Sequence, residues 1–196
     1  MMLTVNEKKV LRFLAISLVN SYSINDIARA CKLTPNGAYK LLAKFENEGV
    51  LIAKKIANIK AYRLNFNSEK TTLVLELAFM SDKIEGRIKL RAEDIKPLRD
   101  VTKACVLFGS YITTKKEPGD LDALFVLEKK NFETYKKALS RVQDITPVKI
   151  QDVVQTPNDL EQNLKKEDPI VTVALREGIV LWGFGALVDV IKNVNQ

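Results

Sequence analysis

The segment of residues 104–127 constrains this chain more than any other, because it joins two apolar runs through a Gly-Ser pair and a double acid. The first run ends at Gly109 and Ser110, and the second opens with Asp120 and Asp122. Side chains alternate across a strand, so the two aspartates point to the same side. Like charges held that close are costly unless a cation lies between them, and Mg²⁺ commonly binds one or two carboxylates together with substrate phosphates. Since glycine and serine at a strand end suit a phosphate, the segment predicts a metal and nucleotide site.

These residues, in the strings LFGSY and GDLDALFVL, resemble the signature of the polymerase-beta-like nucleotidyltransferases. The likeness is greatest to the minimal forms of archaea and bacteria, and it covers about residues 92–190. The resemblance implies that Gly109 and Ser110 bind the phosphates of an NTP. It also implies that Asp120, Asp122 and a third acid act as catalytic residues and hold two Mg²⁺ ions, while NMP is transferred and pyrophosphate is released.

The third acid expected from the resemblance is Asp152. The segment Val148–Val154 is the only strand-like stretch downstream of the motif that carries an acid. The chain also departs from many relatives at Thr114 and Gly119, where they have Gly and Ser.

The chain contains no histidine, which excludes several classes of enzyme. Ser-His-Asp and Cys-His nucleophilic sites, two-histidine metalloproteases and histidine bases are all ruled out. Metal-assisted phosphoryl transfer is compatible with the carboxylates, hydroxyls and cations that are present. The only two cysteines, Cys31 and Cys105, lie within apolar patterns, so we expect buried, reduced thiols.

The net positive charge of the chain is confined to the N-terminal third. Residues 1–66 hold 11 Lys+Arg against 4 Asp+Glu, whereas residues 67–196 hold 20 of each. The excess predicts a nucleic-acid-binding surface in the first segment rather than in the segment that carries the acid pair.

Three helical patterns followed by a hairpin occupy that first segment. We expect Asn6 to cap the first helix, Ser23 the second and Thr34 the third, where Pro35 takes the first helical position. Two basic strands would then pair around residues 57–58. This order, over about residues 5–66, resembles the winged helix-turn-helix domains of transcription regulators, whose second helix-turn-helix element enters the major groove.

The resemblance implies a DNA-binding set on the third helix and on the hairpin. Asn36, Tyr39 and Lys40 would face the bases, and the remaining cations would contact phosphates. The full set is Asn36, Tyr39, Lys40, Lys44, Lys54, Lys55, Lys60 and Arg63. RNA binding, or use of the module for protein contacts or dimerisation, stays open as an alternative.

Residues 67–91 are expected to form one linker helix. Leu73, Leu77, Met80, Ile84 and Ile88 recur at helical spacing and form one apolar stripe. The stripe would pack on the chain's own domains or, through residues 71–89, pair two copies of the protein as a homodimer.

Strands 104–108, 121–127, 148–154 and 179–182 alternate with helices 131–142, 157–165, 169–176 and 186–194 in the rest of the chain. The sequence therefore predicts an α+β protein of two domains: a winged helix (1–66), the linker helix, and a nucleotidyltransferase-like mixed sheet flanked by helices (92–196). No leader or membrane span is evident, so we expect a cytoplasmic protein.

The expected function is Mg²⁺-dependent NMP transfer to an unidentified acceptor, coupled to DNA binding. One alternative is a transcription regulator whose second domain only senses nucleotide or mediates contacts, which the departures at Thr114 and Gly119 favour. Another is an antitoxin-type nucleotidyltransferase that modifies a partner protein.

Overall fold

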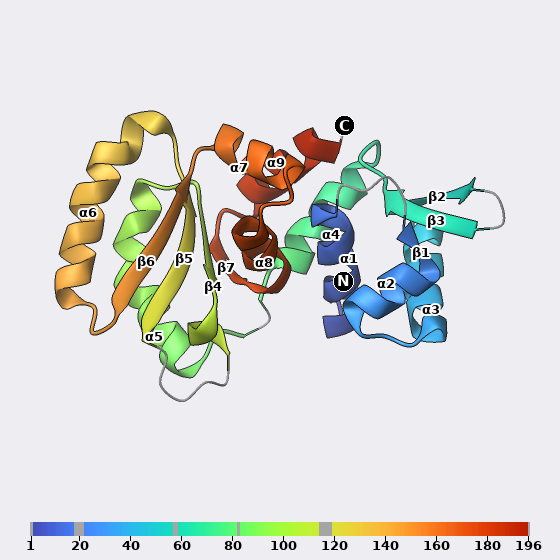
Figure 1. Ribbon diagram of the computed structural model, residues 1–196, viewed down its shortest axis with the longest axis horizontal. Coiled ribbons are helices and arrows are strands. Elements are labelled where there is room, and N and C mark those ends of the chain that lie inside the picture. The colour runs from blue at the N-terminus through green and yellow to red at the C-terminus, as the bar shows by residue number, and fades with distance from the viewer. Residues whose placement is uncertain (1, 18–21, 57–58, 82, 114–118, 196) are drawn as a thin grey trace. The chain divides into compact units, whose positions relative to one another are not determined.

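A computed structural model describes residues 2–17, 22–56, 59–81, 83–113 and 119–195 of the chain. The chain forms two compact units, and we describe each by itself (Figure 1). Unit 1 comprises Met1–Phe79 with Ile191–Gln196, and unit 2 comprises Met80–Val190. Helices and two separate sheets, one of them mixed, make this an α+β protein. Within the described ranges, none of the helices has the length and apolar character needed to cross a bilayer.

Unit 1 combines four helices with a small antiparallel sheet of strand order β1-β3-β2. Its elements are α1 (Val5–Ile16), β1 (Tyr22–Ser23), α2 (Ile24–Cys31), α3 (Pro35–Asn47), β2 (Leu51–Ile56), β3 (Ile59–Leu64) and α4 (Glu69–Phe79). The three predicted helices and the two strands of the hairpin are confirmed. Residues 57–58, around which the hairpin was expected to turn, lie outside the described residues.

Side-chain caps fix where these helices begin. The expected cap at Asn6 is wrong, because Thr4 caps α1 and forms a reciprocal capping box with Glu7. Ser23 caps α2 as predicted, and the Thr34 side chain accepts from the Gly37 N–H at the start of α3. Each cap satisfies backbone donors that the first helical turn leaves without a partner.

The predicted linker helix is not continuous: α4 ends at Phe79, and the next helix, α5, begins at Gly86. Arg12 provides a physical reason, because its Nε donates to the Ala78 carbonyl at 2.9 Å and its Nη2 to the Phe79 carbonyl at 2.8 Å. A continuing helix would use these carbonyls for its own next turn. The guanidinium also lies 5.1 Å from the centre of the Phe79 ring.

The apolar stripe predicted for this segment does not pack as a whole on the chain's own units, and the pairing of two copies through residues 71–89 stays a prediction. Leu73 is 62% exposed and Met80 is 45% exposed. The α4 side chains that unit 1 buries are instead Thr71, Val74, Leu75, Ala78 and Phe79. A helix turns by about 100° per residue, so an apolar face that is shifted by one or two positions is easily misassigned from sequence.

Unit 2 is built around a four-stranded sheet of order β6-β5-β4-β7, in which β5 and β6 are parallel and the other neighbours antiparallel. Its strands are β4 (Ala104–Phe108), β5 (Asp120–Val126), β6 (Lys149–Gln155) and β7 (Ile179–Trp182). Its helices are α5 (Gly86–Ile95), α6 (Phe132–Ile145), α7 (Pro157–Lys165), α8 (Pro169–Glu177) and the first part of α9 (Phe184–Asn195), whose residues from Ile191 on belong to unit 1. Short 3-10 turns lie at Lys96–Asp100, Ser110–Ile112 and Lys129–Asn131. All four predicted strands and the four later helices are confirmed to within a few residues.

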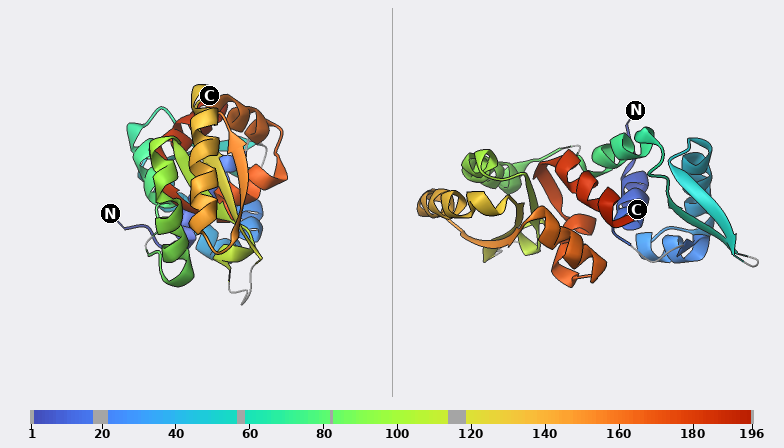
Figure 2. Two further views of the ribbon diagram at one scale, coloured as in Figure 1. Left: turned by 90° about the vertical axis from the view of Figure 1, so that its left-hand side faces the viewer. Right: turned by 90° about the horizontal axis from the view of Figure 1, so that it is seen from above.

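Helices cover both faces of this sheet. Helices α5 and α6 lie side by side over one face, as the left view of Figure 2 shows, and α7, α8 and α9 lie on the other (Figure 1). The first face holds the main core, which includes Leu107, Leu121, Phe125, Tyr135 and Trp182.

Both cysteines, Cys31 and Cys105, are buried free thiols, as expected.

Replacement of Arg12 by Met should lower the free energy of unfolding by about 2–4 kcal/mol, because two carbonyls lose charged donors. Urea denaturation measures the change. Arg29→Met, on the exposed face of α2, is the control and should change stability by no more than about 0.5 kcal/mol. Equal effects of the two substitutions would contradict the role assigned to Arg12.

Candidate functional site

The acid pair stands at the edge of the unit 2 sheet, where β4 ends and β5 begins. Asp120 and Asp122 are the first and third residues of β5, so their side chains share one sheet face, and both are partly exposed. Asp122 is paired across the ladder with Phe108, the last residue of β4. The predicted arrangement of the two acids is therefore confirmed.

Electrostatics at this edge disfavour two negative charges. Burial, and then the charge of Asp120, raise the pKa of Asp122 above its ordinary value. In the absence of a cation, ionised Asp122 therefore destabilises the folded chain at neutral pH. A bound cation would remove this repulsion.

Gly109 lies directly against Asp122, the second acid of the pair. Its backbone, at φ 73° and ψ −156°, occupies a region that is essentially restricted to glycine. A Cβ atom at this position would overlap the carboxylate of Asp122. Both observations explain why the first residue of the Gly-Ser pair is glycine: only a bare backbone allows the loop to approach the carboxylate this closely.

Ser110 opens the 3-10 turn that follows, and its side chain is partly exposed. Its carbonyl accepts from the Thr113 N–H at 3.2 Å and from the Thr113 hydroxyl at 2.7 Å. The turn after Gly109 is therefore closed by local hydrogen bonds. Thr114, one of the departures from the family pattern, lies outside the described residues.

Asp152 is not brought together with the acid pair. In the parallel ladder of β5 and β6, Asp152 is paired with Ala123, whose side chain belongs to the core under α6. The Tyr135 hydroxyl of α6 donates to the Asp152 carboxylate at 3.0 Å, on the opposite face from Asp120 and Asp122. The structure therefore does not bring Asp152 together with Asp120 and Asp122, and its role as a third metal ligand stays a prediction.

The residues that β6 does place on the face of the acid pair are Gln151, paired with Asp122, and Lys149, paired with Asp120. Both are exposed. Because side chains alternate, a candidate one position along the strand lies on the wrong face. Residues two positions apart on a strand share a face, so Asp152 lies on the same face as Ile150, an apolar residue of the core. This alternation can be counted in the sequence.

Over the described residues, no group of three or more acidic or cysteine side chains is arranged to hold a metal ion. Two carboxylates suit one Mg²⁺, whose remaining ligands are normally water and phosphate oxygens. Asp120 and Asp122 therefore fit one ion, whereas the described residues offer no third carboxylate for the two-ion arrangement that the resemblance implies.

Unit 1 carries the eight predicted nucleic-acid-binding residues, and all of them are exposed. On α3, Asn36, Tyr39 and Lys40 are exposed. On the hairpin, the β2–β3 register puts Lys54 on the same sheet face as Arg63, while Lys55 lies opposite Lys60 on the other. Like charges paired across strands are unfavourable unless an anion compensates them.

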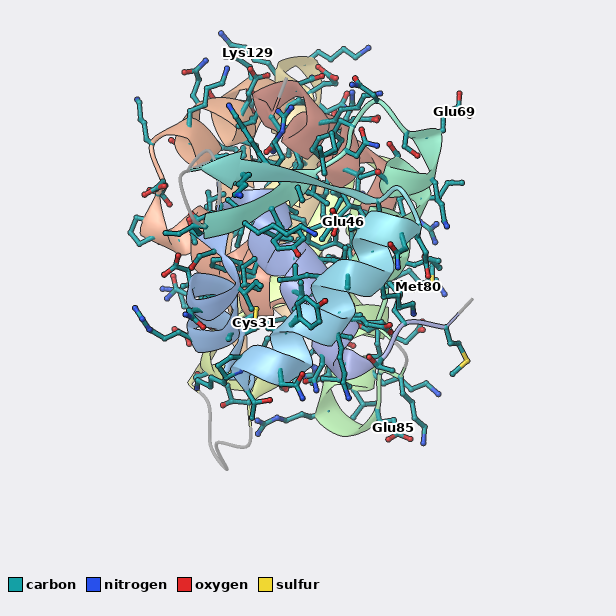
Figure 3. All side chains as sticks on the ribbon, turned by 90° about the vertical axis from the view of Figure 1, so that its right-hand side faces the viewer. Cys31, Glu46, Glu69, Met80, Glu85 and Lys129 are labelled. Atoms are coloured by element: carbon teal, nitrogen blue, oxygen red, sulfur yellow. The ribbon has the colours of Figure 1, made fainter. Side chains whose placement is uncertain are left out.

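Two of the predicted cations already have acidic partners within unit 1. Lys44 Nζ lies 2.6 Å from the buried Glu7 carboxylate, and Lys60 Nζ lies 2.6 Å from Glu46 of α3. Glu46 is labelled in Figure 3. These contacts raise the pKa of both lysines. Lys44 and Lys60 are thus compensated internally, whereas the described residues provide no ion pair for Lys54, Lys55 or Arg63.

No family model matches the sequence, and comparisons with curated proteins and with solved structures find no similar protein.

Replacement of Gly109 by Ala should lower the free energy of unfolding by about 2 kcal/mol or more, because it forces a side chain into a glycine-only conformation. Gly109→Ala should also weaken the binding of any cation held by Asp122. Gly119→Ala is the matched control, since a Cβ there meets no atom within 4 Å. Thermal unfolding of both variants can be followed by circular dichroism. Equal stability of Gly109→Ala and Gly119→Ala would contradict the role assigned to Gly109.

Proposed function

We propose that this protein binds DNA through a winged helix in unit 1 and a Mg²⁺-bound nucleotide through a nucleotidyltransferase-like site in unit 2. The observation that carries the proposal is the close approach of the Gly109 backbone to Asp122, beside the like charge of Asp120. The two carboxylates could bind a metal ion, and the adjacent Gly109–Ser110 turn could bind a phosphate, at the same edge of the sheet.

Each site residue has a distinct role in this proposal. Asp120 and Asp122 hold the cation, which supplies the positive charge that brings triphosphate to a pair of acids. Ser110 donates its hydroxyl to a phosphate oxygen, and Gly109 lets the loop that carries Ser110 approach the Asp122 carboxylate closely. Lys149, at the adjacent ladder position, adds positive charge on the same sheet face.

Charge and exposure support DNA binding by unit 1. The first third of the chain carries the whole positive excess. In this proposal α3 presents Asn36, Tyr39 and Lys40 to the major groove, and Lys54, Lys55 and Arg63 of the hairpin contact phosphates. Lys44 and Lys60 contribute less, because acidic side chains already compensate them.

The pairing of Asp152 with Ala123, on the sheet face opposite Asp120 and Asp122, favours nucleotide binding without transfer. A regulator that responds to nucleotide needs only to bind Mg²⁺ and triphosphate. Transfer chemistry also needs a group that orients or deprotonates the acceptor hydroxyl, and Asp152 is bonded to Tyr135 on the other face.

NMP transfer, to a nucleic acid or to a protein, is the second candidate. The Gly-Ser pair and the two acids at family spacing favour it, and an acid contributed by the acceptor or its complex would supply the third carboxylate. Incubation with labelled ATP, CTP, GTP and UTP separates the two candidates: transferred label supports an enzyme, whereas tight binding without transfer supports a sensor.

Mg²⁺-dependent nucleotide binding should be lost in Asp120→Asn and Asp122→Asn. Each substitution removes a charged oxygen ligand but preserves side-chain shape. Without metal, Asp122→Asn should raise the unfolding temperature at pH 7, where the aspartate is ionised, and this gain should disappear as the pH falls below the raised pKa of Asp122.

Isothermal titration calorimetry with Mg²⁺-ATP is the measurement for these variants, and Asp152→Asn is the matched control. Because Asp152 lies on the opposite face, its replacement should leave the affinity within about threefold, or about 0.7 kcal/mol. Loss of binding in Asp152→Asn alone would refute the site as described.

DNA affinity should fall steeply with salt, and Lys55→Ala should reduce the slope of log K against log salt by about one unit. Lys60→Ala, its neighbour across the strands, is the control. It should leave the slope nearly unchanged because Glu46 already neutralises Lys60. Fluorescence anisotropy with a duplex at several salt concentrations gives both slopes, and a salt-independent affinity would contradict DNA binding through this surface.

A further inference from the structure

An arginine far from the motif in sequence holds the turn that follows Gly109. Arg87 is the second residue of α5. Its Nη2 donates to the Thr113 carbonyl at 2.6 Å, and its Nε donates to the Tyr111 carbonyl at 3.2 Å. The guanidinium also lies 5.1 Å from the centre of the Tyr111 ring. One side chain thus makes three contacts with two residues of the turn.

The opposite side of this turn is held by the core and by local hydrogen bonds. The Tyr111 side chain is 6% exposed and belongs to the main core. The Thr113 N–H and hydroxyl both donate to the Ser110 carbonyl. The peptide unit is planar and trans, so fixing the Tyr111 carbonyl also fixes the Ile112 N–H, which points the opposite way. Arg87 therefore sets the orientation of backbone groups next to Ser110.

Arginine suits this role better than lysine. Its planar guanidinium presents several donors in a fixed geometry and stacks on an aromatic ring, whereas the lysine ammonium is a flexible point charge. Sequence patterns gave no sign of Arg87, because its partners lie 24 and 26 residues along the chain.

We propose that Arg87 is a positioning residue for phosphate binding: it holds residues 110–113 in the conformation that receives the phosphates of a Mg²⁺-bound nucleotide. This inference rests on the proposed nucleotide site. Arg87 acts through the turn and does not itself contact the nucleotide. Its replacement should therefore loosen the turn and weaken nucleotide binding together, while the global fold is kept.

Arg87→Lys tests the proposal, and Arg91→Lys on the same helix is the matched control, since Arg91 pairs with Asp94 rather than with the turn. Hydrogen exchange of residues 110–113 and calorimetry with Mg²⁺-ATP are the two readouts. Arg87→Lys should accelerate exchange in the turn and weaken Mg²⁺-ATP binding about tenfold, or about 1.4 kcal/mol. Arg91→Lys should do neither. Arg87→Gln, which retains a single amide donor group, should show the same pair of effects if Arg87→Lys folds poorly.

Faster exchange with unchanged Mg²⁺-ATP affinity would show that the contacts of Arg87 are only structural, and unchanged exchange would show that Arg87 does not hold the turn. Either result would overturn the inference while leaving the nucleotide site intact. A wild-type protein that binds none of the four Mg²⁺-nucleotides would instead refute the proposed function itself, and this inference with it.

Discussion

The repulsion between Asp120 and Asp122, at a sheet edge where the Gly109 backbone touches the second carboxylate, is the constraint on which the rest of unit 2 depends. Two acids on one face of a strand raise the free energy of the folded chain unless a cation joins them. Two neighbouring residues hold the loop beside this acid pair in a fixed conformation. Gly109 adopts a conformation restricted to glycine, and Arg87 secures the turn behind it by bonding to two carbonyls. A carboxyl whose pKa is raised by burial and by a neighbouring like charge is typical of functional sites.

In unit 1, acidic side chains of the same unit neutralise some of the lysines. Glu7 is almost fully buried, and it joins the cap of α1 to Lys44 of α3. Glu46 joins α3 to the hairpin through Lys60. These ion pairs join helices and strands, whereas the described residues provide no ion pair for Lys54, Lys55 or Arg63 of the hairpin. Charge counted from the sequence therefore overstates how many lysines are available for a nucleic acid.

The fold could be predicted largely from local signals, because strand alternation, capping residues and glycines act over a few positions. The strands 104–108 and 179–182 and the caps at Ser23 and Thr34 follow from such signals. The errors have non-local causes. The end of α4 depends on Arg12, which is distant in sequence, and the partners of Lys44 and Lys60 come from other elements. Asp152 was expected beside the acid pair because the resemblance predicts an acid on this strand. The alternation of side chains along β6 instead puts Asp152 on the opposite face.

The number of metal ions bound with a nucleotide tests the central claim most directly, because it depends on whether Gln151 or an acid lies beside the pair. Mn²⁺ binding can be counted by electron paramagnetic resonance in the presence of a non-hydrolysable NTP analogue. The account predicts one ion per wild-type chain, and a second ion in Gln151→Asp, where a third carboxylate joins the face of Asp120 and Asp122. Two ions in the wild type, with one lost in Asp152→Asn, would contradict it.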